Sequence, residues 1–201
     1  ATLPADATLT NGAGTFSATL NTAGDQTITA TDTVTSGITG TSGTIAVSSG
    51  AATHFTVTAP GTTPAFSSFY VTVTALDAFN NTATGYTGTV HFTSTDGAAT
   101  LPADATLTNG TGSFTATLNT IGSQTITATD TVTPSIAGTS GSITVSAPVA
   151  THLSVSAAPT TTAGAAFNVT VTALDARNGT VTGYKGTVHF TSSDGLAILP
   201  A

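Results

Sequence analysis

The chain repeats itself with a period of 98 residues. Residues 1–12, ATLPADATLTNG, recur letter for letter at 99–110, and His54 and Tyr86 return as His152 and Tyr184. A period of this length is too long for one solenoid turn and matches the size of a small folding domain. The repeat therefore limits the fold to a series of similar domains.

Two short stretches indicate where these domains meet. Gly, Ser, Ala and Pro are concentrated at residues 48–54 and again at 146–152, and an alternating apolar pattern follows each stretch. We predict a complete domain at 51–147, the C-terminal half of a domain at 1–48 and the N-terminal half of another at 149–201. Half a domain would expose a divided core and open sheet edges. Each half is therefore expected to need a partner, either further tandem repeats of a longer chain or subunits that complete each other.

Within 51–147 the apolar residues alternate with polar ones, which is the period of a β-strand. In the segment 69–77, for example, Val71 and Val73 fall on one face and Thr72 and Thr74 on the other. Similar segments occur at 54–59, 88–95, 112–118, 123–130 and 140–147. Turn motifs such as APGTTP, DAFNN, TDG and VTPSIAG separate them. The pattern predicts an all-β Greek-key sandwich of about seven strands in each repeat.

The composition restricts the classes of partner and compartment. The net charge is −7, and Arg177 and Lys185 are the only fixed positive charges, which argues against binding to a phosphate backbone. Cysteine and methionine are absent, so disulfide and zinc-thiolate sites are excluded and the chain offers few oxidisable groups. No apolar run is long enough for a membrane span. We therefore expect an extracellular or cell-surface location.

The stretch from VTVTALDAFNNTATGY to SQTITATD, which covers most of one repeat, resembles bacterial immunoglobulin-like repeats of the invasin and intimin type. The similarity lies in the Asp-Ala turn, the Gly-aromatic step, the Val-x-Phe strand and the Thr-Ile-Thr-Ala strand. It implies tandem immunoglobulin-like sandwiches, as found in large repetitive surface or extracellular fibre proteins. In that family such repeats form stalks, while the binding tips lie elsewhere.

The sequence offers few candidates for chemistry. His54 and His91, with their counterparts His152 and His189, fall on outward strand positions, and no nucleophile motif accompanies them. We predict no enzyme activity, no catalytic residues and no cofactor. Calcium is the alternative that the repeated aspartates raise, because calcium binds six to eight oxygen atoms. Each aspartate stands alone in its loop, however, and turn capping explains it better, so no metal site is predicted.

Asn80 and Asn178 are candidate glycosylation sites. Both begin an Asn-x-Thr motif at the same position of the repeat, in an expected turn. The alternative is that both are ordinary turn asparagines.

Together these features predict a structural component of an extracellular filament or cell-surface stalk, built from immunoglobulin-like domains joined end to end. Its partners would be copies of itself or further repeats, with a glycan as a possible ligand. One alternative is an adhesin repeat that binds a glycan or a receptor. A second alternative is a spacer rod that calcium makes rigid.

Overall fold

A computed structural model describes residues 1–199 of the chain. It divides into two compact units, residues 1–145 and the segment from residue 146 onward. The described residues form strands, turns and loops without any helix, which confirms the predicted all-β class. No described segment is a helix long and apolar enough to cross a membrane.

The first unit contains one complete sandwich and a shorter N-terminal part. The strands of the N-terminal part are β1 (Gly24–Gln26), β2 (Thr29–Thr31), β3 (Thr39–Thr41) and β4 (Ile45–Val47). The sandwich consists of β5 (His54–Thr58), β6 (Thr62–Pro64), β7 (Ser68–Leu76), β8 (Thr89–Ser94), β9 (Ala105–Thr106), β10 (Thr111–Thr117), β11 (Gly122–Gln124), β12 (Ile126–Asp130), β13 (Ala137–Thr139) and β14 (Ile143–Ser146).

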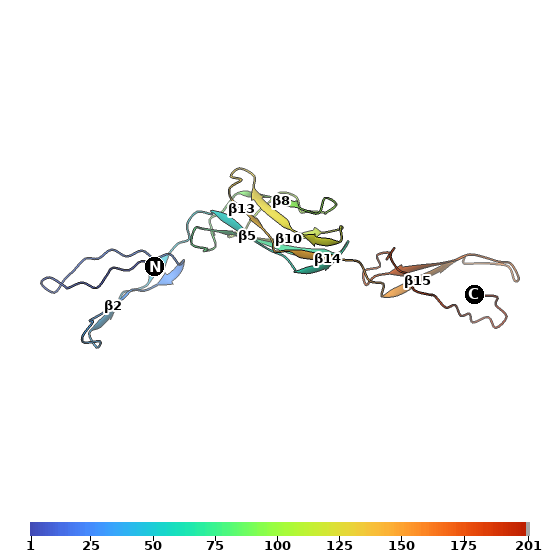
Figure 1. Cartoon of the computed structure of the whole chain (residues 1–201), viewed down its shortest axis with the longest axis horizontal. Helices are drawn as coiled ribbons and strands as arrows, with labels where there is room; N and C mark the ends of the chain where they lie inside the picture. The colour runs from blue at the N-terminus through green and yellow to red at the C-terminus, as the bar shows by residue number, and fades with distance from the viewer. Residues whose placement is uncertain (200–201) are drawn as a thin grey trace. The chain divides into compact units, whose positions relative to one another are not determined.

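Two sheets enclose the core of this sandwich (Figure 1). One sheet has the order β10-β7-β5 and the other the order β13-β12-β8-β9, with antiparallel neighbours throughout. A third, small sheet joins β11, β14 and β6. The chain crosses between the two sheets from β7 to β8 and again from β10 to β12. These two crossings give the Greek-key topology of an immunoglobulin-like domain.

Seven of the ten strands correspond to the six segments predicted from the sequence, because β11 and β12 share the segment 123–130. Thr125 alone separates β11 from β12, and side-chain hydroxyls here add to the backbone hydrogen bond that the Thr95 amide donates to the Thr125 carbonyl. The Ser94 hydroxyl donates to the Thr125 carbonyl, and the Thr125 amide donates to Thr95 Oγ1, at 2.8 and 2.9 Å.

Three short strands were not predicted from the sequence. β6 and β13 lie in stretches read as the turns APGTTP and VTPSIAG, and β9 has only two residues. Their residues, such as Pro64 and Gly138, have low strand propensity. Neighbouring strands hold them in place, so the two turn assignments were wrong at 62–64 and 137–138, while 59–61 and 132–136 lie outside strands as predicted.

The core consists of the side chains that the alternation assigns to one face. Val71, Val73, Val90, Ile126 and Leu118 are completely buried, while Tyr70 on the opposite face of β7 is exposed. Across the strand pair, Val71 lies opposite Phe114 and Val73 opposite Gly112. Residues from both halves of the repeat therefore share one core.

The N-terminal part contains two small antiparallel pairs, β1–β4 and β2–β3. In the second, the hydroxyls of Thr29 and Thr41 are 2.8 Å apart, and those of Thr31 and Thr39 are 2.9 Å apart. Such cross-strand threonine pairs each stabilise a sheet by a few tenths of a kcal/mol. Leu9 and Phe16 of this part are exposed.

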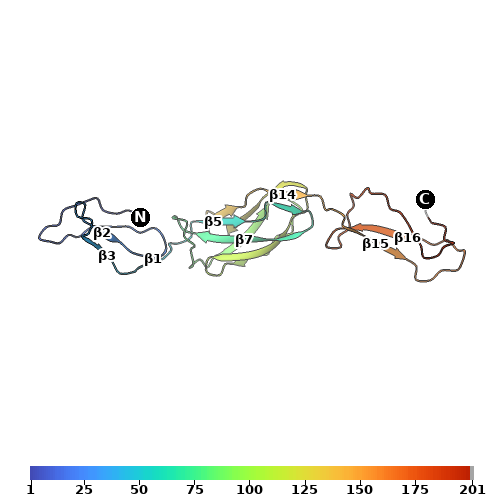
Figure 2. The same cartoon turned by 90° about the horizontal axis from the view of Figure 1, so that it is seen from below.

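The second unit contains one antiparallel pair, β15 (His152–Ala157) and β16 (Val169–Leu174), visible in Figure 2. Their register repeats that of β5 and β7, with His152 opposite Leu174 as His54 is opposite Leu76. No third strand accompanies this pair among the residues that the structure describes. Leu153, Val155 and Phe167 are exposed.

Candidate functional site

An open cleft of about 670 Å³ lies in the first unit, beside Tyr86 and Asp130. It is bordered by residues 48–52, 83–88 and 130–136. The Tyr86 hydroxyl donates a hydrogen bond to Asp130 Oδ2, and the Tyr86 ring meets Phe55 edge-on at a centroid distance of 5.4 Å. A Cβ on Gly88 would overlap both Tyr86 and Asp130, so glycine leaves room for this pair.

The side-chain oxygen atoms of Tyr86 and Asp130 form hydrogen bonds within the sandwich. Asp130 Oδ1 accepts from the amides of Val132 and Thr133, at 2.8 and 2.6 Å. Burial alone would raise the pKa of Asp130, but the hydrogen bonds from Tyr86 and the two amides lower it. Burial and the neighbouring Asp130 carboxylate raise the pKa of the Tyr86 hydroxyl. The cleft therefore presents a neutral tyrosine and a carboxylate that accepts three hydrogen bonds.

Asp96 joins the two halves of the sandwich. Its Oδ2 accepts from the amides of Asn119 and Thr120 at 2.6 and 2.9 Å, and its Oδ1 accepts from the Thr120 hydroxyl at 2.7 Å. The Ala98 amide also donates to Oδ1, at 2.9 Å. Burial opposes ionisation, but these four hydrogen bonds outweigh it and lower the pKa of Asp96 to about 2.

Asp77 caps the turn that follows β7. Its Oδ1 accepts from the amides of Phe79 and Asn81, at 2.8 and 2.9 Å, and its Oδ2 accepts from the Gly50 amide at 2.8 Å. The Asn81 side chain also donates to Asp77 and, despite burial, this bond is the main reason that the pKa of Asp77 is lowered. These contacts confirm the predicted turn cap at Asp77.

Asn81 also connects this turn to the N-terminal part. Its Nδ2 donates to the Asn21 carbonyl at 2.8 Å, and its Oδ1 accepts from the Ala23 amide at 2.9 Å. The counterpart of Asn81 in the next repeat is Gly179, which has no side-chain amide. Sequence reasoning missed this role, because nothing in the pattern distinguishes Asn81 from the other turn asparagines.

His54, His91 and His152 form hydrogen bonds with nearby side chains. His54 Nε2 lies 3.1 Å from Asn80 Oδ1, and His91 Nδ1 lies 2.7 Å from Asp104 Oδ1 on the surface. Among residues 1–199 no three His, Asp or Glu side chains come together to form a metal-binding group. Asp77, Asp96 and Asp130 instead accept hydrogen bonds from amides and hydroxyls of the chain.

We expect removal of calcium to leave the thermal stability unchanged. The oxygen atoms of Asp77, Asp96 and Asp130 are occupied by hydrogen bonds, so an added chelator has no structural ion to withdraw. Thermal unfolding with EDTA and with excess calcium should give midpoints that agree within about 1 °C. A rise of several degrees on adding calcium would instead support the calcium-stabilised rod.

The two sequon asparagines occupy equivalent exposed turns. Asn80 and Asn178 have positive φ angles of 64° and 65°, and each places its Oδ1 about 3 Å from a histidine Nε2, of His54 and His152 respectively. Asparagine tolerates this left-handed conformation better than most residues, which is consistent with a turn role. The same geometry leaves Nδ2, the atom that would carry a glycan, out of the bond to histidine.

Exposed aromatic side chains are present in the complete sandwich but are not repeated. Phe66, Tyr70 and Phe79 are 69%, 72% and 58% exposed. Their counterparts in the next repeat are Gly164, Asn168 and Arg177. Phe66 also has a positive φ of 64°, a strained conformation that Gly164 adopts without cost.

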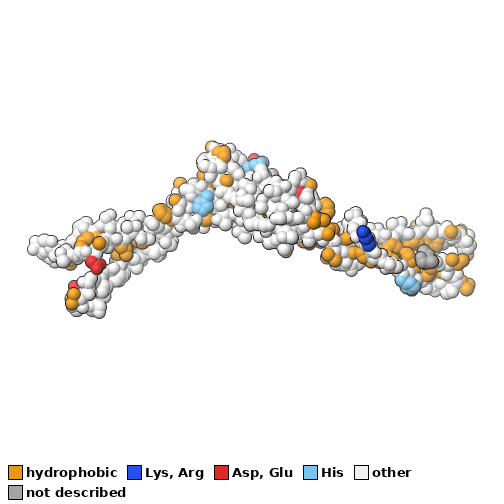
Figure 3. Space-filling view, viewed as in Figure 1, with side chains coloured by type: hydrophobic (Ala, Val, Ile, Leu, Met, Phe, Trp, Pro, Cys, Tyr) orange, Lys and Arg blue, Asp and Glu red, His pale blue; other side chains and the backbone are white. Residues whose placement is uncertain are grey.

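The sequence has nine aspartates and two cationic residues, and few charged side chains are visible on the face shown in Figure 3. The outward face of β7 and β10 consists mainly of threonine and serine, such as Thr72 and Ser113, whose hydroxyls are 3.5 Å apart. This surface is hydroxyl-rich and nearly neutral.

No protein-family model and no curated protein matches the chain. Among solved structures it is similar to FdeC, an adhesin of Escherichia coli, at 23% identity over 70% of this chain and 47% of that chain, with a TM-score of 0.41. It is also similar to domains 4–9 of the surface layer protein SbsC, at 20% identity over 73% of this chain and 24% of that chain, with a TM-score of 0.39. The chain spans less than half the length of either.

Proposed function

We propose that the chain is a structural component of an extracellular filament or cell-surface stalk, built from immunoglobulin-like domains joined end to end. The observation that carries this proposal is that the buried carboxylates accept hydrogen bonds from amides and side chains of the same chain. Asp77, Asp96 and Asp130 each cap a turn, and Asp96 and Asp130 also bind across the sandwich. A repeat whose polar groups serve its own stability suits a mechanical role.

The repeat itself supports the same function. Nearly identical domains give each junction similar residues, so a fibre can extend without a change in geometry. The neutral hydroxyl-rich surface and the absence of cysteine and methionine suit long exposure outside the cell.

Electron microscopy of cells that produce the protein, with antibodies raised against the purified chain, tests the proposal. Labelled filaments or stalks that extend from the cell surface are expected. Label confined to the cell interior would overturn the proposal, and a strain lacking the gene provides the control for antibody specificity.

We expect such filaments to be insensitive to salt. Only Arg177 and Lys185 carry fixed positive charge, so ion pairs contribute little to any contact between subunits. Filaments should keep their length in about 1 M NaCl, where charges are screened beyond about 3 Å. Negative-stain microscopy measures filament length at each salt concentration. Dissociation at high salt would contradict this expectation.

An adhesin repeat is the second candidate function, and the exposed Phe66, Tyr70 and Phe79 favour it. Aromatic side chains of this kind contribute strongly to binding surfaces. A glycan array probed with the chain and with Tyr70→Asn, which copies the next repeat, tests this role. Binding that the substitution removes would favour adhesion, whereas an array without hits favours the structural role.

We further propose Asn80 and Asn178 as glycosylation sites, on the basis of their exposure and equivalent positions. Mass spectrometry of peptides from the native protein tests this proposal. Glycan attached at both positions is expected. Unmodified peptides at both positions would contradict the proposal and indicate that Asn80 and Asn178 serve only as turn residues.

A further inference from the structure

The Asn81 side chain forms a two-way contact between the complete sandwich and the N-terminal part. Its Nδ2 donates to the Asn21 carbonyl at 2.8 Å, and its Oδ1 accepts from the Ala23 amide at 2.9 Å. Both partner atoms belong to the backbone just before β1. Because one side-chain amide is donor and acceptor at once, the contact fixes the orientation of the segment 21–23 as well as its distance.

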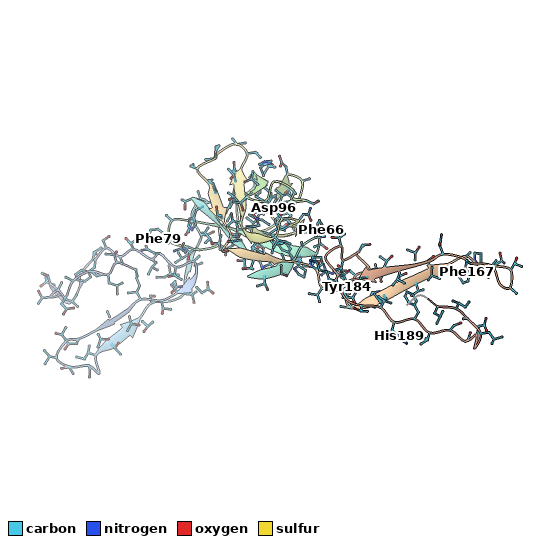
Figure 4. The ribbon with its side chains drawn as sticks, turned by 45° about the vertical axis from the view of Figure 1, so that its right-hand side comes forward. Phe66, Phe79, Asp96, Phe167, Tyr184 and His189 are labelled. Carbon is cyan, nitrogen blue, oxygen red and sulfur yellow. The ribbon has the colours of Figure 1, made fainter. Side chains whose placement is uncertain are left out.

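Asp77 holds Asn81 in position for this contact. The Asn81 Nδ2 also donates to Asp77 Oδ2 at 3.0 Å, and the same oxygen accepts from the Gly50 amide at 2.8 Å. Asp77 is buried, and Gly50 lies in the connection between β4 and β5. One carboxylate therefore joins that connection to the turn that contacts the N-terminal part. Figure 4 shows this turn, marked by Phe79, at the end of the sandwich that adjoins the N-terminal part.

The next repeat lacks both contributions. Gly179 occupies the position of Asn81 and has no side chain. Pro148 occupies the position of Gly50, and proline has no amide hydrogen to donate. The connection that contains Pro148 therefore has neither the side-chain amide nor the backbone N–H that these contacts need.

The turn itself is the same in both repeats. The Asp175 carboxylate accepts from the Gly179 amide at 2.8 Å, and the Asp175 amide donates to the Gly179 carbonyl at 2.9 Å. The corresponding bonds between Asp77 and Asn81 are both 2.9 Å long. A glycine at this position therefore preserves the turn and removes only the side chain.

We propose that Gly50, Asp77 and Asn81 form a lock that holds the N-terminal part in a fixed orientation on the complete sandwich. Repeats with Pro148 and Gly179 at the equivalent positions provide no such lock. Domains that a short connection joins without a large interface move relative to one another by default. The inference deepens the proposed function, on which its biological meaning rests, because these two positions then determine how stiff each joint of a filament is.

Hydrogen exchange of the full chain, followed by NMR for each residue, tests the lock at one of its own hydrogen bonds. The Ala23 amide donates to Asn81 Oδ1, so it should exchange slowly in the unmodified chain. The amide of its counterpart Ile121 has no hydrogen-bond partner within residues 1–199 and should exchange fast. Asn81→Gly, which copies the next repeat, should accelerate the exchange of Ala23 at least about tenfold.

The Thr19 amide is the internal control for folding of the N-terminal part. It donates to the Thr2 carbonyl at 2.8 Å, away from Asn81, so its exchange should be the same in both chains. Unchanged exchange of Ala23 in Asn81→Gly would contradict the proposal. Equal acceleration at Thr19 and Ala23 would also overturn it, because Asn81 would then support the folding of the N-terminal part and not its attachment.

Residual dipolar couplings of the same chains measure the orientation directly. In the unmodified chain, the strands β1–β4 and β5–β14 should fit a single alignment tensor. A double variant with Gly50→Pro and Asn81→Gly, which copies both differences of the next repeat, should require two. Gly50→Ala is the matched control, because it keeps the amide hydrogen and its Cβ would lie 3.5 Å from Asp77, an ordinary contact.

Two results of this measurement would overturn the lock. One tensor for every chain would mean that other contacts fix the orientation, and two tensors for the unmodified chain would mean that nothing fixes it. The lock and the extracellular filament fail separately. Filaments on cells, with Ala23 exchange unchanged in Asn81→Gly, would retain the filament and remove the lock. A locked joint in a chain found only inside cells would retain the lock and remove the extracellular filament.

Discussion

Replacing Gly138 with alanine is expected to destabilise the complete sandwich by about 3 kcal/mol or more. A Cβ at this position would overlap the Phe55 carbonyl oxygen and lie 2.7 Å from its carbonyl carbon. Both atoms belong to the backbone of β5, so no side-chain rotation relieves the clash. β13 has to move away from β5, which opens the edge of the buried core. Thermal unfolding should show a midpoint lowered by about 12 °C or more.

The repeat provides a matched control for this substitution. Gly40 occupies the same position in the N-terminal part, where a Cβ has open space. Gly40→Ala should leave the unfolding of the complete sandwich within about 0.5 kcal/mol of the unmodified chain. Equal midpoints for Gly138→Ala and the unmodified chain would show that β13 does not approach β5 as closely as described.

Replacing Asp96 with alanine is expected to cost about 3–4 kcal/mol of folding free energy. The substitution removes the acceptor of the Asn119 and Thr120 amides and of the Thr120 hydroxyl, which join the end of β8 to the turn after β10. These donors would be left without a partner in a partly buried turn. Chemical denaturation of both chains measures the difference. Asp194→Ala is the control, because Asp194 accepts one hydrogen bond among the described residues.

The same carboxylate predicts how stability depends on pH. Its pKa is lowered to about 2 in the folded chain from an ordinary value near 3.8. Because the folded state favours the ionised form, the stabilisation is complete above the unfolded pKa and is lost as the pH falls from about 4 towards 2. Asp77 and Asp130, whose pKa values are also lowered, add to the same loss.

Denaturation midpoints measured between pH 2 and pH 7 test this dependence. The unmodified chain should be equally stable from neutral pH to about pH 5 and lose stability below about pH 4. Asp96→Asn, which cannot ionise, should show a smaller loss over the acid range. An identical acid profile for the two chains would mean that Asp96 contributes nothing to the pH dependence.

The sequence alone determined the period, the strand class and the face that each strand buries. Alternation separates Val71 and Val73 from Tyr70 and Thr72, because successive side chains of a strand point to opposite faces. Single aspartates before small residues predicted turn caps, and the bonds of Asp77 to Phe79 and Asn81 confirm them. These features are local, so a single stretch of chain contains the information. The domain limits at 51–147 and the glycosylation of Asn80 and Asn178 remain predictions.

Only the tertiary structure decided which distant groups meet. Asp96 and Thr120 are bonded although 24 residues separate them, and Tyr86 reaches Asp130 across 44. β13 forms at Gly138 despite weak local propensity, because β12 supplies hydrogen bonds on one side and the missing Cβ lets β5 approach. Such contacts depend on how the two sheets stack, which alternation along one strand does not specify.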